Sequence, residues 1–242
     1  MRKNFALLFV LSFQTVLISV FAQTEVQHEY VDLGLSVKWA TCNVGADKPE
    51  DSGDFIAWGE TSPYYSSLNP RVWKEGKESG YNWSSYFDVK TYPSSDPRYY
   101  QSNFGITFKK YDISTGNTIL EAVDDAAHVN WGGNWRIPTV KEIKELIENC
   151  TWTWTTLNGV EGYKIISISN GNSIFLPAAR FVYNPDSDPV NQYITANYWS
   201  SSLSSSYSYC AGSLFFNKIN HRIYLEDNTE RNNPLPIRPV CP

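Results

Sequence analysis

Histidine and closely paired cysteine, the side chains that many metal and redox sites use, are scarce in this sequence of 242 residues. The three histidines are His28, His128 and His221, and the four cysteines are widely spaced, with no Cys-x-x-Cys pair. This spacing argues against a zinc site or a thioredoxin-like dithiol. A three-histidine iron site would need His28, which is expected in a mobile N-terminal tail. We therefore expect no such cofactor, and we assign each histidine a surface or capping role.

A serine nucleophile motif is also missing. The run Trp199-Ser200-Ser201-Ser202 lacks the Gly-x-Ser-x-Gly elbow, and the sequence places no His or Asp to serve it. The run instead predicts the start of a strand, in which Trp199 packs inside and the hydroxyls satisfy backbone groups. We expect a protein that is not an enzyme.

Apolar runs long enough to cross a bilayer are absent after residue 22. Residues 1–22 have the pattern of a secretory signal, with Arg2 and Lys3, then an apolar stretch, then a small residue at Ala22. An uncleaved anchor is the alternative, although polar residues interrupt the stretch. We expect export to the periplasm, the cell surface or the medium, with a short tail at 23–29 and no transmembrane anchor once the signal is removed.

Positive charge is in deficit. Removing Arg2 and Lys3 with the signal changes the formal net charge from −5 to −7, which argues against nucleic acid and anionic membranes as partners. The remaining chain is long enough to bury a large core without the support of disulfides or metal ions. In an exported protein the four cysteines, Cys42, Cys150, Cys210 and Cys241, are expected to form one or two disulfides, and the sequence does not choose the pairing.

The clearest local signal is a switch from loop to helix at residues 131–150. Pro138 cannot lie inside a helix, Thr139 suits the N-cap, and Glu142 completes a capping box, so a helix is expected from about Val140. A second helix is expected at about 122–130. In the preceding loop Trp131 and Trp135 flank a Gly-Gly pair, and we interpret this block, with Arg136, as a structural nucleus.

Short apolar runs at 36–40, 163–168 and 173–176 are bounded by Gly, Asn and Pro, which predicts short strands. Together with the two helices they indicate an α+β class with long irregular loops.

Several motifs, in one order over about residues 30–242, resemble those of a family of exported bacterial proteins, the Fibrobacter succinogenes major paralogous domain family. The motifs are residues 30–46, 49–55, 57–61, 124–127, 131–139, 149–152, 176–179, 198–202 and 237–241. The resemblance implies a C-type lectin-like fold related to the formylglycine-generating-enzyme scaffold, in which two short helices pack on small twisted antiparallel sheets. It implies a single domain at 30–242, structural roles for Trp199 and Arg238, and an elaborated insertion at about 62–116, where the match is weakest.

The resemblance also makes calcium the one metal to weigh, because lectin-like domains often use it. Asp186 and Asp188 offer clustered oxygens in a turn, and residues 226–228 offer a second acidic cluster. Such residues are also ordinary turn formers. The copper chemistry of formylglycine-generating enzymes is not expected, because it uses a closely spaced cysteine pair and Cys210 and Cys241 are far apart in sequence.

The region 191–238 is rich in residues that suit adaptable binding surfaces, with seven Asn, five Tyr and eight Ser among 48 residues. The candidate ligand-binding face contains Tyr193, Tyr198, Tyr207, Tyr209, Asn217, Asn220 and Tyr224. The alternative is that the alternation here marks strands with half of the rings buried. We expect a non-enzymatic protein that binds a glycan or an extracellular protein. The alternatives are a structural subunit of an extracellular assembly and a metal-dependent enzyme on the related scaffold.

Overall fold

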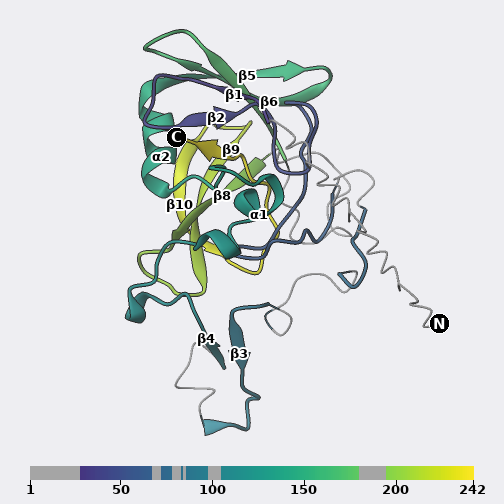
Figure 1. Ribbon diagram of the computed structural model, residues 1–242, viewed down its shortest axis with the longest axis vertical. Helices are drawn as coiled ribbons and strands as arrows, with labels where there is room; N and C mark the ends of the chain where they lie inside the picture. The colour runs from purple at the N-terminus through teal and green to yellow at the C-terminus, as the bar shows by residue number, and fades with distance from the viewer. Residues whose placement is uncertain (1–27, 67–71, 78–82, 84–85, 98–104, 180–194) are drawn as a thin grey trace, which may run out of the picture.

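The computed structural model describes residues 28–66, 72–77, 83, 86–97, 105–179 and 195–242. The signal expected at 1–22 lies outside these residues, as do Tyr193, Asp186 and Asp188. The described part contains four small antiparallel sheets and two short α-helices (Figure 1). The α+β class is therefore confirmed. No helix in this part is long and apolar enough to cross a membrane.

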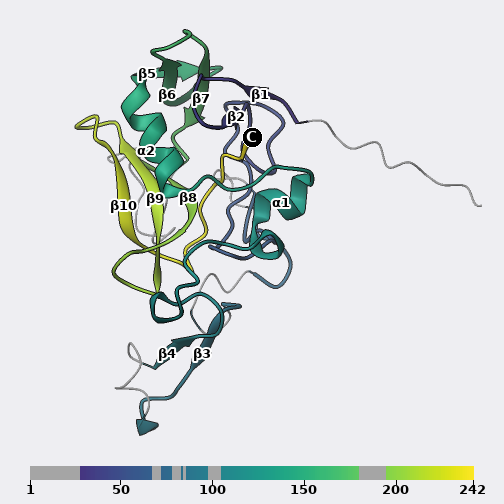
Figure 2. The ribbon, with the colours of Figure 1, turned by 60° about the vertical axis from the view of Figure 1, so that its left-hand side comes forward.

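The predicted capping-box helix is confirmed as α2, Val140–Asn149. The Thr139 N–H donates to the Glu142 carboxylate at 2.8 Å, and the Glu142 N–H donates to the Thr139 hydroxyl at 3.3 Å. The buried face of α2 contains Ile143 and Leu146. This face packs against the sheet formed by residues 195–203, 210–217 and 223–230 (Figure 2).

The prediction of one continuous second helix at about 122–130 is wrong. The segment forms a 3-10 turn, Ala122–Asp124, and then a separate helix α1, Ala126–Trp131. Asp125 separates them because its carboxylate accepts the N–H groups of Ala127 at 2.9 Å, His128 at 3.1 Å and Ile137 at 2.9 Å. An N-cap that also binds a third backbone N–H stabilises a break at this residue.

The two ends of the described chain meet in one sheet, with strand order β1-β2-β11. The strands are β1, Tyr30–Val31, β2, Lys38–Ala40, and β11, Val240–Cys241. The second sheet consists of β5, Cys150–Leu157, β6, Val160–Ser167, and β7, Ser173–Pro177. Strands were predicted at 36–40, 163–168 and 173–176, and all three predictions are confirmed with shifted ends.

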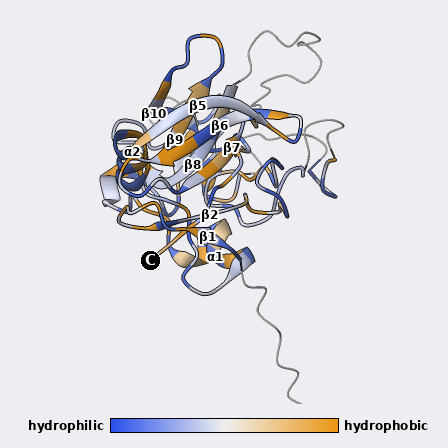
Figure 3. Ribbon diagram, turned by 90° about the horizontal axis from the view of Figure 1, so that it is seen from above, coloured by the Kyte–Doolittle hydropathy of each residue, from blue (hydrophilic) through white to orange (hydrophobic). Residues whose placement is uncertain are grey.

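The third sheet consists of β8, Thr195–Leu203, β9, Cys210–Asn217, and β10, Ile223–Glu230, in the order β10-β9-β8. Apolar residues mark β9 and the start of β10 in Figure 3, whereas the turn that joins them is mainly hydrophilic. Trp199 lies within β8 and is fully buried, as expected, and its indole N–H donates to the Ile56 carbonyl at 2.8 Å. The Ser200 hydroxyl donates to the Gly212 carbonyl at 2.7 Å, so the predicted bonding of serine hydroxyls to the backbone is confirmed. The prediction that this run starts a strand is wrong, because the run lies in the second half of β8.

Within 62–116 the structure shows a small hairpin of β3, Val89–Thr91, and β4, Ile106–Phe108, followed by a 3-10 turn, Ile113–Thr115. The hairpin stands away from the other sheets (Figures 1 and 2). Its base is held by an ion pair between Asp88 and Arg231, whose side chains are 1% and 0% exposed.

All four cysteines are free thiols, so the expected disulfides are not formed in this structure. Cys241 lies opposite Lys38 in the β2–β11 ladder, whereas Cys42 lies two residues beyond the end of β2. Cys150 lies opposite Ser167 on β6, and Cys210 lies opposite Glu230 on β10.

Candidate functional site

The predicted ligand-binding face does not assemble as one surface. Tyr198 is 2% exposed, its hydroxyl donates to the Pro177 carbonyl at 2.7 Å, and its ring packs on Phe216. It is a core residue, because its side chain belongs to the buried cluster that also contains Ile143 and Leu146 of α2. Including Tyr198 in the binding face was therefore wrong, and the alternative of alternating buried rings holds for it.

The other described residues of this face are divided between the two ends of the third sheet. Tyr207 and Tyr209 lie in the loop between β8 and β9, whereas Asn217 and Asn220 lie at the turn between β9 and β10. The eight residues of β9 separate these ends by about 26 Å. Asn217 and Asn220 shape their turn, since the Asn217 side chain accepts the Asn220 N–H at 3.1 Å and the Asn220 side chain accepts the Arg222 N–H at 3.2 Å.

Tyr224 lies near the β9–β10 turn, as the second residue of β10, on the opposite side of the strand from the core. Its ring contacts Phe215 with centroids 4.9 Å apart, and it is 40% exposed. Tyr207 and Tyr209 form a tilted pair with centroids 5.3 Å apart, and Tyr207 is 49% exposed. The exposed tyrosines suited to contact a ligand are therefore Tyr207 and Tyr224, at separate places.

A cavity of about 560 Å³ opens at the Tyr207 end of the sheet, between β8, β10, the start of α2 and the segment 113–119. We name it the C-terminal cavity. Its polar lining consists of Thr118, Ser202, Ser204, Ser205, Glu226 and Asp227. Ile119, 47% exposed, and Leu225 supply apolar surface in the same lining. This volume is within the range of small-molecule sites, about 300–1,000 Å³.

Hydrogen bonds across the cavity fix the loop that carries Tyr207. The Asp227 carboxylate accepts the Ser205 hydroxyl at 2.7 Å and the Ser205 N–H at 3.1 Å. The Ser204 hydroxyl accepts the N–H groups of Ser206 and Tyr207, both at 3.1 Å. On the far wall, the Ser202 hydroxyl accepts the first N–H of α2, from Val140, at 3.2 Å. The hydroxyl groups are thus held in place before any ligand binds, which lowers the entropy cost of binding.

Glu226 is the second carboxylate of the C-terminal cavity. It is half-buried, and burial raises its pKa, while a hydrogen bond from Asn197 at 3.5 Å acts in the opposite direction. A raised pKa means that the folded state binds this proton more tightly than the unfolded state. The charged carboxylate therefore lowers stability at neutral pH, and the folded protein recovers that stability as the pH falls through the pKa of Glu226.

Glu226→Gln is accordingly expected to be more stable than the wild type at pH 7. The difference should shrink toward zero below about pH 4, where the wild-type side chain is protonated in both states. Urea unfolding at a series of pH values measures this. Glu148→Gln, on the exposed side of α2, is the control, and an identical pH profile for the two variants would refute the assignment.

Sequence reasoning found only part of this cavity. The acidic cluster 226–228 was noted as a calcium candidate, and the serine run at 200–202 was treated as structural. The contribution of Thr118 and Ile119 was not foreseen, because only the fold brings their segment beside β8, where the Leu203 N–H donates to the Thr118 carbonyl at 2.7 Å. The run of serines near the end of β8 is the one local sequence feature that could have pointed to this cavity.

The structural residues named from the sequence are not among those that line the C-terminal cavity. Trp131 and Trp135 meet edge to face at 5.1 Å, around Gly132 and Gly133 with φ of +73° and +55°. His28 stacks on Trp131 at 3.7 Å, so the expectation that this histidine lies in a mobile tail is not supported. Burial lowers the pKa of His28.

Arg136 and Arg238 have different partners. Arg136 donates to the Glu142 carboxylate at 2.8 Å, and this ion pair raises the pKa of Arg136. Arg238 is 1% exposed and donates to Asn43 and to backbone carbonyls, and burial lowers its pKa to about 10. Both residues hold the sheet β1-β2-β11 to its surroundings, in keeping with structural roles.

Across the described residues, no three His, Cys, Asp or Glu side chains come together as a metal site would require. His221 lies in the β9–β10 turn, with its Nδ1 3.3 Å from the Tyr163 hydroxyl, and His28 lies against Trp131. The candidate site is therefore the C-terminal cavity, where hydroxyl and carboxylate groups converge. Comparisons of the chain with protein-family models, with curated proteins and with solved structures found no match.

Proposed function

We propose that this chain is an exported, non-enzymatic binding protein that recognises a glycan at the C-terminal cavity. The observation that carries the proposal is the lining, where fixed hydroxyls and two carboxylates lie beside apolar surface, at the loop that also carries the exposed Tyr207. Carboxylates accept hydrogen bonds from sugar hydroxyls, and serine hydroxyls both donate and accept. The flat tyrosine ring at the same loop offers a face for the apolar side of a sugar ring.

The acidic character of the cavity favours a neutral or cationic ligand. Glu226 and Asp227 are its charged lining residues, and the whole chain has a formal net charge of −5. An anionic glycan or a nucleic acid would meet like charge here. A neutral, polyhydroxylated ligand is therefore the class that fits best.

We propose further that the chain has a C-type lectin-like fold and belongs to the family its motifs resemble. Support comes from the sheet that joins the two ends of the described chain and from α2 packed on the third sheet. A binding function without catalysis agrees with the separate positions of Cys210 on β9 and Cys241 on β11, which do not form the close pair of formylglycine-generating enzymes.

A glycan array, probed with purified protein with and without calcium, gives the first test. We expect saturable binding to neutral glycans. For a glycan identified in this way, Tyr207→Ala should weaken binding about tenfold in isothermal titration calorimetry, because it removes an exposed ring next to the cavity. Tyr30→Ala is a matched control, since Tyr30 is 50% exposed and lies on β1. Equal losses in both variants, or an array without hits for folded protein, would contradict the proposal.

A structural subunit of an extracellular assembly is the second candidate. The β3–β4 hairpin favours it, because this hairpin pairs with no other strand of the described residues and stands away from the other three sheets (Figure 2). Light scattering during size-exclusion chromatography distinguishes the two proposals. A concentration-dependent oligomer that is lost when the hairpin is changed would support the assembly role.

A further inference from the structure

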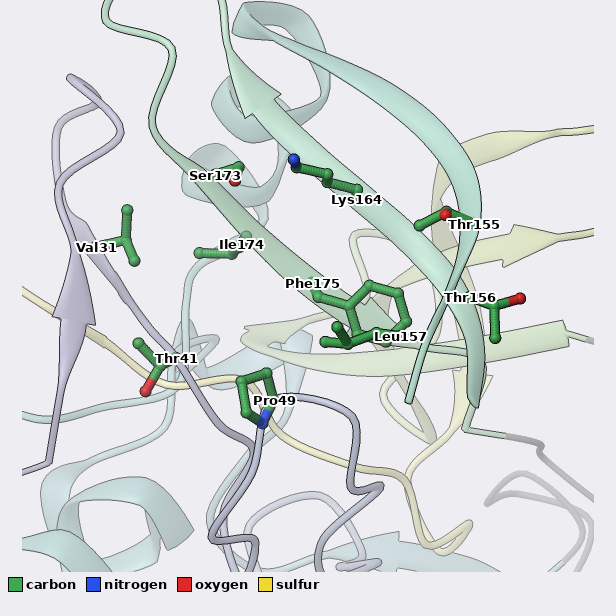
Figure 4. Close-up of a pocket in the computed structure, with 10 residues that line it drawn as sticks. All are labelled: Val31, Thr41, Pro49, Thr155, Thr156, Leu157, Lys164, Ser173, Ile174 and Phe175. Carbon is green, nitrogen blue, oxygen red and sulfur yellow. The ribbon is translucent and has the colours of Figure 1, made fainter. Parts of the chain in front are cut away.

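A second cavity, of about 360 Å³, lies between the β5-β6-β7 sheet and residues 31–49 (Figure 4). We name it the sheet cavity. Its apolar lining consists of Val31, Pro49, Leu157, Ile174 and Phe175. Four hydroxyl residues, Thr41, Thr155, Thr156 and Ser173, and one charged residue, Lys164, complete the lining. None of these residues belongs to the C-terminal cavity.

Cross-strand pairs between β6 and β7 build the apolar floor. Lys164 pairs with Phe175 across the β6–β7 ladder, and Gly162 pairs with Pro177. A Cβ atom at Gly162 would lie 2.7 Å from the Phe175 ring and 2.2 Å from the Leu176 carbonyl, so only glycine lets the ring lie flat on β6. In Figure 4 the Phe175 ring lies beside Leu157 and above Pro49.

Two sets of hydrogen bonds join the two walls of the sheet cavity, which are the segment 31–50 and the β5-β6-β7 sheet. At one end, Asn170 and Asn172, in the turn between β6 and β7, donate to the Asp32 carbonyl at 3.1 and 2.8 Å. At the other end, the Asn158 side chain, in the turn between β5 and β6, donates to the Glu50 carboxylate at 2.9 Å. The segment 31–50 is therefore fastened to the sheet on both sides of the cavity, and the cavity exists before a ligand enters.

We propose that the sheet cavity binds a small amphipathic carboxylate, with its apolar chain on Phe175 and Leu157 and its carboxylate at Lys164. Lys164 is exposed and supplies the one charge in the lining, which is positive in a chain of negative net charge. Its side chain extends from β6 toward Ser173 (Figure 4), so an ammonium and a hydroxyl serve the same end of the cavity. These groups complement an anionic head, and the apolar floor complements a short hydrocarbon chain.

The test compares octanoate with 1-octanol, which share a chain and differ in head group. Each is titrated into ¹⁵N-labelled protein and followed by NMR. We expect saturable shifts at 155–157 and 173–175, and tighter binding of octanoate than of 1-octanol. Lys164→Gln should weaken octanoate binding about fivefold, the scale of an exposed ion pair, and leave 1-octanol unchanged.

Lys144→Gln is the matched control, because Lys144 is an exposed lysine on the outer face of α2. It should leave both affinities unchanged. The proposal is overturned if octanoate and 1-octanol bind equally, if Lys164→Gln and Lys144→Gln behave alike, or if the shifts map outside the sheet cavity. Each of these outcomes is independent of whether the C-terminal cavity binds a glycan.

Discussion

Arg231→Met is expected to lower the free energy of unfolding by about 3–5 kcal/mol, because it leaves the Asp88 carboxylate buried without its ion-pair partner. Both side chains are almost fully buried. The Arg231 guanidinium also donates to the Tyr111 and Ser208 carbonyls at 3.0 and 2.8 Å. It lies 4.6 Å from the centroids of the Trp58 and Phe108 rings. One arginine thus fastens the base of the β3–β4 hairpin to the C-terminal segment.

Chemical denaturation measures this loss, and Lys218→Met is the control. Lys218 pairs with Glu161 at the surface, where the two side chains are 45% and 33% exposed, so its loss should cost less than about 1 kcal/mol. Hydrogen exchange should also rise at 86–89 and 108–111 in the Arg231 variant. A loss for Arg231→Met no larger than that for Lys218→Met would show that the buried pair does not hold the hairpin.

Arg238→Met is expected to cost a similar amount, about 3–5 kcal/mol, for a different reason. Arg238 has no carboxylate partner among the described residues. Its guanidinium donates to the Asn43 side chain at 2.8 Å and to the Ala40 and Thr41 carbonyls at 3.0 and 2.6 Å. Methionine fills the space but leaves these acceptors buried and unsatisfied, at about 1–3 kcal/mol each.

Arg222→Met is the matched control for this measurement. Arg222 is exposed at the β9–β10 turn, so the change should alter stability by no more than about 0.5 kcal/mol. Thermal and urea unfolding of both variants give the comparison. Similar stabilities for the Arg238 and Arg222 variants would mean that the buried hydrogen bonds contribute little.

Local signals in the sequence predicted local structure well. Thr139 and Glu142 fixed the start of α2, because a capping box depends on residues three apart in the chain. The bend at Gly132 and Gly133 was also predictable, because the Gly-Gly pair itself permits the positive φ angles found there. The break before α1 did not, because Asp125 also binds the Ile137 N–H, which only the folded chain brings within reach.

The contacts that the sequence did not reveal join distant segments. Arg231 and Asp88 are separated by 143 positions, and nothing near either residue marks the other as its partner. Tyr198 was assigned to a binding face by its residue type, yet its place on β8 directs it into the core. The C-terminal cavity was predicted only as a region, because its Thr118 wall comes from a segment more than 80 residues before β10.

Hydrogen–deuterium exchange, with and without a glycan selected from the array, tests the central proposal most directly. We predict protection at 202–209 and at 225–227, where the C-terminal cavity meets the Tyr207 loop, and no change at the β3–β4 hairpin. Protection confined to the hairpin or to the β9–β10 turn, with none at 202–209, would contradict a glycan site in the C-terminal cavity.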